Sequence, residues 1–190
     1  MIFFVLKKKN ELNFLRTIGI SKSNFDYFNN SIINIEKICW KINKIEILTE
    51  NFKKEKVLNF ETNNNQLFSV VKNFKIYQAL EKSLFKNKNF RNLYKNNYLK
   101  LLNKYDLIIN MDYSNLITKK YFNKKIIKDY YGYAYISEIT HRKISNHTAT
   151  QIFTRYGPLA FLPVSNTKTS LVFSVKKNKK ITNQDLIKLI

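Results

Sequence analysis

Glycine and proline constrain this chain most, because it contains so few of them. Its 190 residues include three glycines and two prolines. Where such a chain keeps glycine or proline, the backbone needs an unusual φ angle or a stop to a regular element. Gly157 and Pro158 are adjacent, and Pro163 follows closely. We therefore expect turns and strand ends in this part of the chain.

The residues around the Gly157-Pro158 break alternate as β-strands require. Before the break, alternation places Gln151 and Phe153 on the same side of one strand. After it come an apolar segment, a polar turn and a further alternating segment, which together predict a small sheet. The predicted strands are Ala149–Tyr156, Leu159–Val164 and Thr169–Val175.

Capping and alternation signals elsewhere predict a mixture of strands and helices. Either Ser21 or Ser23 is expected to cap a short helix, and Asn73 is expected to cap a longer one that runs to about Phe85. A continuous apolar run near the N-terminus indicates a buried strand. The expected strands are Ile2–Leu6, Lys44–Glu50, Lys56–Glu61, Leu67–Val71 and Tyr131–Ile139, and the expected helices are Asn73–Phe85 and Asn183–Ile190.

Tyrosines mark one face of the strand that precedes the Gly157 region. Tyr131, Tyr133 and Tyr135 share that face, and Ala134 and Ile136 lie on the other. Such a stripe is either ordinary core and surface filling or a surface that binds an aromatic ring. Both interpretations stay open at this point.

The formal net charge of +21 raises the question of a nucleic-acid partner. The lysines, however, are spread through every segment. Arginine suits bidentate contacts to phosphates and bases, and it occurs only at Arg16, Arg91, Arg142 and Arg155. We expect no specific nucleic-acid partner, and a basic nucleic-acid-binding protein is the third candidate function.

Cysteine, histidine and hydropathy exclude several kinds of site. Cys39 is the only cysteine, so the chain has no internal disulfide and no thiolate cluster. His141 and His147 lack a neighbouring pattern of cysteines or carboxylates, so we expect no metal site. No apolar run approaches the roughly 20 residues of a membrane span. We expect a cytoplasmic protein, at most peripheral to the inner face of the membrane.

The Gly157 region resembles a known family. The spaced set Ala-x-Gln-x-Phe-x-x-x-Gly-Pro-Leu-Ala-x-Leu-Pro, followed by Ser-Leu-Val-Phe-Ser, is similar to the middle domain of the FAD-dependent ring hydroxylases of ubiquinone biosynthesis. These are flavin monooxygenases of the p-hydroxybenzoate hydroxylase type. The resemblance implies an aromatic, polyprenyl-type small molecule as substrate, FAD as cofactor and NAD(P)H as electron donor. It implies a substrate-side motif of Gln151, Phe153, Gly157, Pro158 and Pro163.

The resemblance also reaches the cofactor segments, with departures. It implies that Arg16 and Asp112 contact FAD. Lys7 stands where the family has an acidic residue for the ribose, and Asn110 and Tyr113 replace glycines of the second flavin fingerprint. The Gly-x-Gly-x-x-Gly turn that receives a pyrophosphate has no counterpart, because the three glycines are far apart. No catalytic residue can be named.

These observations predict an α/β to α+β fold, with an incomplete Rossmann-like FAD-binding half and a mostly antiparallel substrate-domain sheet with helices. The expected segments of one compact unit are a nucleotide-binding remnant (1–40), strands of the substrate-side sheet (41–72), a helix and the return to the nucleotide-binding half (73–125), and the substrate-domain sheet with a final helix (126–190). The expected function is that of an impaired or partial FAD-dependent monooxygenase-like protein, with a protein partner supplying the missing FAD-binding segments. The alternative is a non-catalytic binding or scaffold subunit of a ubiquinone-biosynthesis complex.

Overall fold

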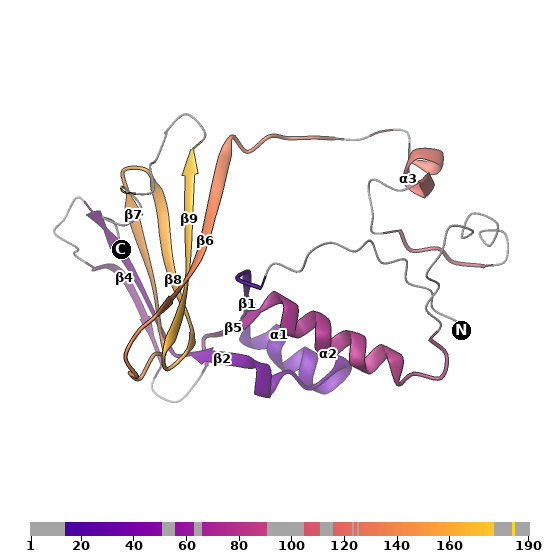
Figure 1. Ribbon diagram of the computed structural model, residues 1–190, viewed down its shortest axis with the longest axis horizontal. Coiled ribbons are helices and arrows are strands. Elements are labelled where there is room, and N and C mark those ends of the chain that lie inside the picture. The colour runs from indigo at the N-terminus through magenta and orange to yellow at the C-terminus, as the bar shows by residue number, and fades with distance from the viewer. Residues whose placement is uncertain are drawn as a thin grey trace. The chain divides into compact units, whose positions relative to one another are not determined.

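A computed structural model of the chain describes residues 14–50, 56–62, 66–90, 105–110, 116–122, 124, 126–176 and 184. The chain forms two compact units (Figure 1). The smaller unit, Met1–Asn10 with Leu84–Tyr130, contains helix α3 (Leu116–Tyr121). The larger unit, Glu11–Ser83 with Tyr131–Ile190, contains both β-sheets.

A small antiparallel sheet in the larger unit packs one face against helices. Ile20 and Val71 on this face belong to a buried cluster with Phe25 and Ile76, which project from the helices. The strands in spatial order are β1 (Thr17–Ser21), β5 (Phe68–Lys72) and β2 (Cys39–Ile42). The helices are α1 (Lys22–Tyr27) and α2 (Asn73–Phe85).

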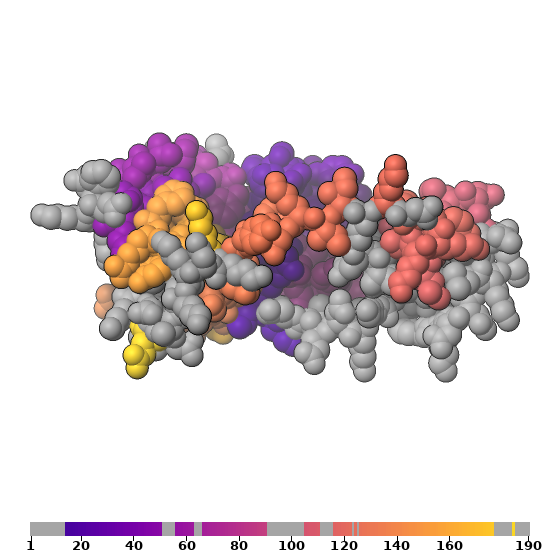
Figure 2. Space-filling model, turned by 90° about the horizontal axis from the view of Figure 1, so that it is seen from above, coloured from indigo at the N-terminus to yellow at the C-terminus, as the bar shows by residue number. Residues whose placement is uncertain are grey.

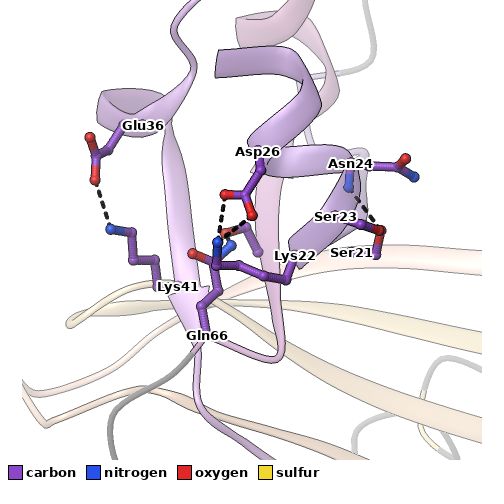
Figure 3. Close-up of polar contacts among 9 residues, drawn as sticks. Ser21, Lys22, Ser23, Asn24, Asp26, Glu36, Lys41 and Gln66 are labelled. Atoms are coloured by element: carbon purple, nitrogen blue, oxygen red, sulfur yellow. Dashed lines mark hydrogen bonds and ion pairs between the residues drawn. The ribbon is translucent and has the colours of Figure 1, made fainter. Parts of the chain in front are cut away.

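Helix α1 begins at one of the two predicted serine caps. The Ser21 hydroxyl oxygen accepts a hydrogen bond from the backbone N–H of Asn24 at 3.3 Å, as an N-cap does (Figure 3). Lys22 then pairs with Asp26 one turn further along the helix. A π-helical turn, η1 (Phe28–Ile32), and a 3-10 turn, η2 (Glu36–Ile38), lead to β2.

A larger sheet of six strands follows the order β4-β3-β7-β8-β9-β6. Neighbouring strands are antiparallel except β3 and β7, which are parallel. The start of edge strand β6 is exposed at the surface (Figure 2). The strands are β4 (Lys56–Glu61), β3 (Lys44–Thr49), β7 (Thr148–Thr154), β8 (Gly157–Ser165), β9 (Lys168–Lys176) and β6 (Gly132–Thr140).

The three strands predicted around Gly157 are present as β7, β8 and β9. Strand β7 ends at Thr154, earlier than predicted, because Arg155 and Tyr156 form the turn into β8. The Thr154 hydroxyl holds this turn by donating to the Gly157 carbonyl oxygen at 2.8 Å and accepting from the Gly157 N–H at 3.3 Å. The helix predicted from Asn73 is also confirmed, whereas β2 was not predicted.

The large sheet has two faces, because successive residues of a strand point to opposite sides. The Gln151 face carries Gln151 and Phe153 of β7, and the Phe173 face carries Phe173 of β9 and Leu159 of β8, which are register partners. The Phe173 face holds the second core of the larger unit. Its buried cluster consists of Leu159, Leu171, Phe173 and Val175.

The small sheet packs on part of the Gln151 face. Ile42 and Val70 from the small sheet share a buried cluster with Ala149 of β7. The hydroxyl groups of Thr17 in β1 and Ser170 in β9 lie 3.2 Å apart and share a hydrogen bond. Helices, small sheet and large sheet therefore form successive layers of the larger unit.

The described residues confirm a mixed α and β fold with two sheets and mostly antiparallel strands. Of the strands expected within 41–72, β3 and β4 belong to the large sheet and β5 to the small one. The expected strand Ile2–Leu6 and, apart from Gln184, the expected helix Asn183–Ile190 lie outside the described residues. Within the described ranges, no helix is both long and apolar enough to cross a membrane.

Candidate functional site

Beyond the small sheet, the Gln151 face carries two rows of side chains, which we name the open rows. In the first row, Gln151 is the register partner of Ala160 in β8 and of Ile47 in β3. In the second row, Phe153 is paired in the same way with Pro158. The first row consists of Ile136, Val172, Ala160, Gln151 and Ile47, and the second of Ala134, Ser174, Pro158, Phe153 and Thr49.

The open rows are accessible to solvent yet carry no charged side chain. Phe153 is 49% exposed, and Leu58 of β4, the register partner of Ile47, is 51% exposed. The first row is half-buried. The open rows thus form a contiguous uncharged surface in a chain of which a quarter of the residues are charged. It suits an apolar ligand or partner.

Gln151 is the polar group at the centre of this surface. Its side chain is half-buried between Ile47 and Ala160, neither of which can form a side-chain hydrogen bond. Among the residues that the structure describes, none hydrogen-bonds to the Gln151 amide. A half-buried amide without a protein partner is costly unless water or a ligand satisfies it. Gln151 is therefore available to a bound molecule.

A charged cluster borders the open rows. Glu138 follows Ile136 on the same face of β6, and its side chain is 13% exposed. It pairs with Lys72 of β5 and with Lys168 of β9, whose Nζ lies 2.8 Å from Glu138 Oε1. The hydrogen bonds from Lys168 and Lys72 hold the pKa of Glu138 below its usual value, although burial opposes this. Both lysines are thus engaged by one carboxylate, which links the two sheets.

Arg16, one of the two residues expected to contact FAD, precedes β1. Its backbone carbonyl accepts a hydrogen bond from the N–H of Asn73 at 2.9 Å, which places Arg16 beside the start of α2. Arg16 is exposed. Asp112, the second expected cofactor residue, lies outside the described residues, and so does Lys7.

The positions of the glycines do not fit a dinucleotide site. A pyrophosphate cradle needs glycines where a strand turns into a helix. Gly19 lies within β1, where it is the register partner of Val70, and Gly132 is the first residue of β6. Gly157 occupies the β7–β8 turn with φ 145°. All three glycines therefore lie in the strands and turns of the sheets, and the described residues do not form a glycine cradle for a pyrophosphate.

The other members of the expected substrate-side motif have different locations. Pro158 lies in the second open row. Pro163 is among the most deeply buried residues and pairs with Thr169 on the Phe173 face. Gly157 shapes the turn. Pro163 and Gly157 thus have structural roles in the sheet. Gln151, Phe153 and Pro158 lie in the open rows.

The tyrosine stripe of β6 does not join the open rows. Tyr133 and Tyr135 are the register partners of Val175 and Phe173, so they project from the Phe173 face. They are 53% and 38% exposed. The residues that do join the surface, Ile47, Ile136 and Val172, carry no signal in the sequence beyond strand alternation, because strand pairing brings them to Gln151.

Both histidines hold loops in place. The His147 Nδ1 donates to the Lys41 carbonyl oxygen at 2.7 Å, and its ring stacks on Trp40 with ring centroids 4.9 Å apart. His141 Nε2 lies 3.0 Å from the Thr169 hydroxyl and 3.3 Å from the Asn146 amide nitrogen. In the described part of the chain, no group of His, Cys, Asp and Glu side chains could hold a metal ion.

The chain matches no protein-family model and no curated protein sequence. Arguments about its function therefore depend on its own residues.

Proposed function

We propose that this chain is a partial, divergent FAD-dependent monooxygenase-like protein, resembling the ring hydroxylases of ubiquinone biosynthesis, in which the large sheet supplies the substrate side. The open rows hold an aromatic ring with an apolar polyprenyl-type tail. Phe153 offers a ring face for stacking, and Gln151 offers the polar contact.

One observation carries this proposal. The residues of the resemblance that face the same way, Gln151, Phe153 and Pro158, lie on an exposed surface without charge in a chain of net charge +21. A surface selected only for solubility would carry charged side chains such as lysine here. Binding of an apolar ligand would explain why the open rows carry no charged side chain.

The cofactor would contact the layer of the helices and the small sheet. We propose that β1 and α1, within segment 1–40, belong to the remnant of a Rossmann-like nucleotide-binding half and that α2 leads back to it, with Arg16 beside the start of α2. The absence of a glycine cradle argues that these residues alone do not retain FAD. Oxygen transfer with FAD and NAD(P)H would then require a protein partner that supplies the phosphate-binding segments.

The positions of the glycines also favour a second candidate function. In that case the chain is a non-catalytic subunit that binds or presents the ring compound within a ubiquinone-biosynthesis complex. The substrate surface is the same in both cases, and only flavin binding differs.

Visible absorption of the purified chain separates the two candidates. A preparation with flavin absorption, or one that gains it on addition of FAD and keeps it through gel filtration, supports the monooxygenase-like function. A colourless protein that binds a geranylated phenol but retains no FAD supports the non-catalytic subunit. A folded chain that binds no geranylated phenol contradicts both.

A further inference from the structure

We propose that the outer edge of β4 is a dimer interface, at which β4 of a second copy of this chain adds to the large sheet. The two strands pair antiparallel about a two-fold axis and join two six-stranded sheets into one. The inference concerns the backbone edge of one strand, so it is independent of the proposed ring binding.

Strand β4 is an unprotected edge of the large sheet (Figure 1). In the part of the chain that the structure describes, it pairs with β3 alone, and all six of its residues are exposed. It contains neither proline nor glycine, and its four central residues, Val57 to Phe60, carry no charge. A register shift interrupts the pairing with β3 only near the Lys56 end. Such an edge is open to the addition of another strand.

A hydrogen bond at the end of β4 shows which backbone groups point outward. The Thr62 N–H donates to the Asn43 carbonyl oxygen at 3.1 Å, so the backbone groups of Thr62 point toward β3. Every second residue of an antiparallel strand points the same way, and Phe60 therefore also faces β3. Asn59 and Glu61 alternate with these residues. Their N–H and C=O groups point to the free edge.

The side chains of β4 match those of a second copy in one register. When the two-fold axis passes between the two Asn59 residues, these exchange two backbone hydrogen bonds, and Leu58 lies opposite Phe60 of the second copy at both ends. Leu58 and Phe60 share the Gln151 face and are 51% and 49% exposed. An axis at Leu58 would instead place Phe60 opposite Lys56, and an axis at Phe60 would place Leu58 opposite Thr62.

The charges of β4 are complementary in the same register. Glu61 lies opposite Val57 of the second copy and therefore beside the adjacent Lys56 of that copy. Within one copy, Lys56 Nζ lies 2.6 Å from Glu46 Oε1, and Lys44 Nζ lies 3.2 Å from Glu61 Oε2. The second copy extends these pairs into a network of alternating charge. An axis at Glu61 would instead set two carboxylates against each other, so charge favours the register with both apolar pairs.

Analytical ultracentrifugation of the full chain over a series of concentrations tests the interface. The wild-type chain should show a monomer–dimer equilibrium without larger species. Asn59→Pro removes the outward N–H without touching the bonds to β3, so it should weaken the dimer at least about tenfold, because both central hydrogen bonds are lost. Asn59→Ala is the matched control, since it keeps the N–H and should dimerise like wild type. Circular dichroism verifies that both variants fold.

Two double variants test the register without a proline. One carries Leu58→Asp with Phe60→Asp, and the other carries Leu58→Lys with Phe60→Lys. Each alone places like charges opposite each other across the two-fold axis, so each should be monomeric. An equal mixture should form a dimer that contains one chain of each kind. All four substitutions are at exposed positions, so the variants should fold.

These measurements decide the inference. A wild-type dimer, its selective weakening by Asn59→Pro and a mixed dimer of the charged variants support it. A folded wild-type chain that stays monomeric, equal dimerisation of Asn59→Pro and Asn59→Ala, or charged variants that do not combine would overturn it. Growth of the wild type beyond a dimer also overturns it, because two β4 edges close the assembly at two copies. If Asn59→Pro does not fold, the mixed dimer decides.

Discussion

Gly157 shows how a single residue fixes the strand that bears the candidate surface. Its φ of 145° lies in a region that L side chains rarely adopt, and an added Cβ would lie 2.0 Å from the Ser174 carbonyl oxygen. Neither strain nor clash can be relieved by rotating a side chain, because the contacting atom is backbone. The β7–β8 turn therefore requires glycine.

The first prediction compares this glycine with another in the same unit. Gly157→Ala should lower the free energy of unfolding by at least about 2 kcal/mol. Gly19→Ala should change the free energy of unfolding little. Its added Cβ would meet only the Phe68 ring at 3.6 Å, an ordinary contact. Urea unfolding monitored by circular dichroism measures both. Equal destabilisation by the two variants would contradict the assignment of strain to the turn.

The second prediction concerns the carboxylate that links the sheets. Glu138→Gln should destabilise the chain by about 1–2 kcal/mol, because Lys72 and Lys168 lose their charged partner. Glu36→Gln, which affects the exposed pair with Lys41, is the control and should change stability little.

Glu138 should also make the stability of the chain depend on pH. Because the folded-state pKa of Glu138 is lowered, its stabilising contribution is present above the ordinary glutamate pKa. It is lost as pH falls through the folded-state value. Unfolding experiments at a series of pH values from neutral to acidic measure this effect. The difference in free energy of unfolding between wild type and Glu138→Gln should become smaller as the pH falls. A difference that grows toward acid would have the wrong sign.

The third prediction concerns the single thiol. Partial burial raises the pKa of Cys39 to about 11, so almost none of it is thiolate at neutral pH. Alkylation by iodoacetamide should be much slower in the folded chain than in urea, and should accelerate as pH rises. Rapid alkylation of the native chain at neutral pH would contradict the burial of Cys39.

At the scale of elements, the helix caps and strand alternation were readable from the sequence. Serine can satisfy a free backbone N–H at a helix start, and Ser21 does so. Alternation located the strands of the Gly157 region, because a strand with a buried face repeats every second residue. Strand β2 was not predicted, since Cys39–Ile42 has four residues, too few for the alternation of Trp40, Lys41 and Ile42 to identify a strand.

Strand pairing is what the sequence could not provide. The parallel pairing of β3 with β7 joins residues about a hundred positions apart and brings Ile47 to Gln151. The register of β6 on β9 sends Tyr133 to the face opposite Gln151. Local patterns define which residues share a face of one strand, but not which strand lies beside it. The candidate surface was therefore only partly visible in the sequence.

The fourth prediction tests the N-cap of α1. Ser21→Ala should destabilise the chain by about 1 kcal/mol, because the Asn24 N–H loses its acceptor. Ser21→Asp should retain most of the stability, since a carboxylate also caps and favours a helix N-terminus. Thermal unfolding of both variants is the measurement, and a Ser21→Asp chain as unstable as Ser21→Ala would rule out capping.

In the molecule as a whole, the two faces of the large sheet have separate roles. The Phe173 face holds a buried core, whereas the open rows of the Gln151 face stay accessible and uncharged beside the small sheet. That separation is expected of a scaffold that keeps one face for stability and the other for a ligand.

Methyl NMR during titration with ortho-geranylphenol tests this division most directly. The account predicts that the methyl signals of Ile47, Ile136 and Val172 in the open rows shift on binding, whereas those of Leu171 and Val175 on the Phe173 face do not. This should occur without added flavin. Shifts confined to the Phe173 face, or no shifts in the folded protein, would contradict the account.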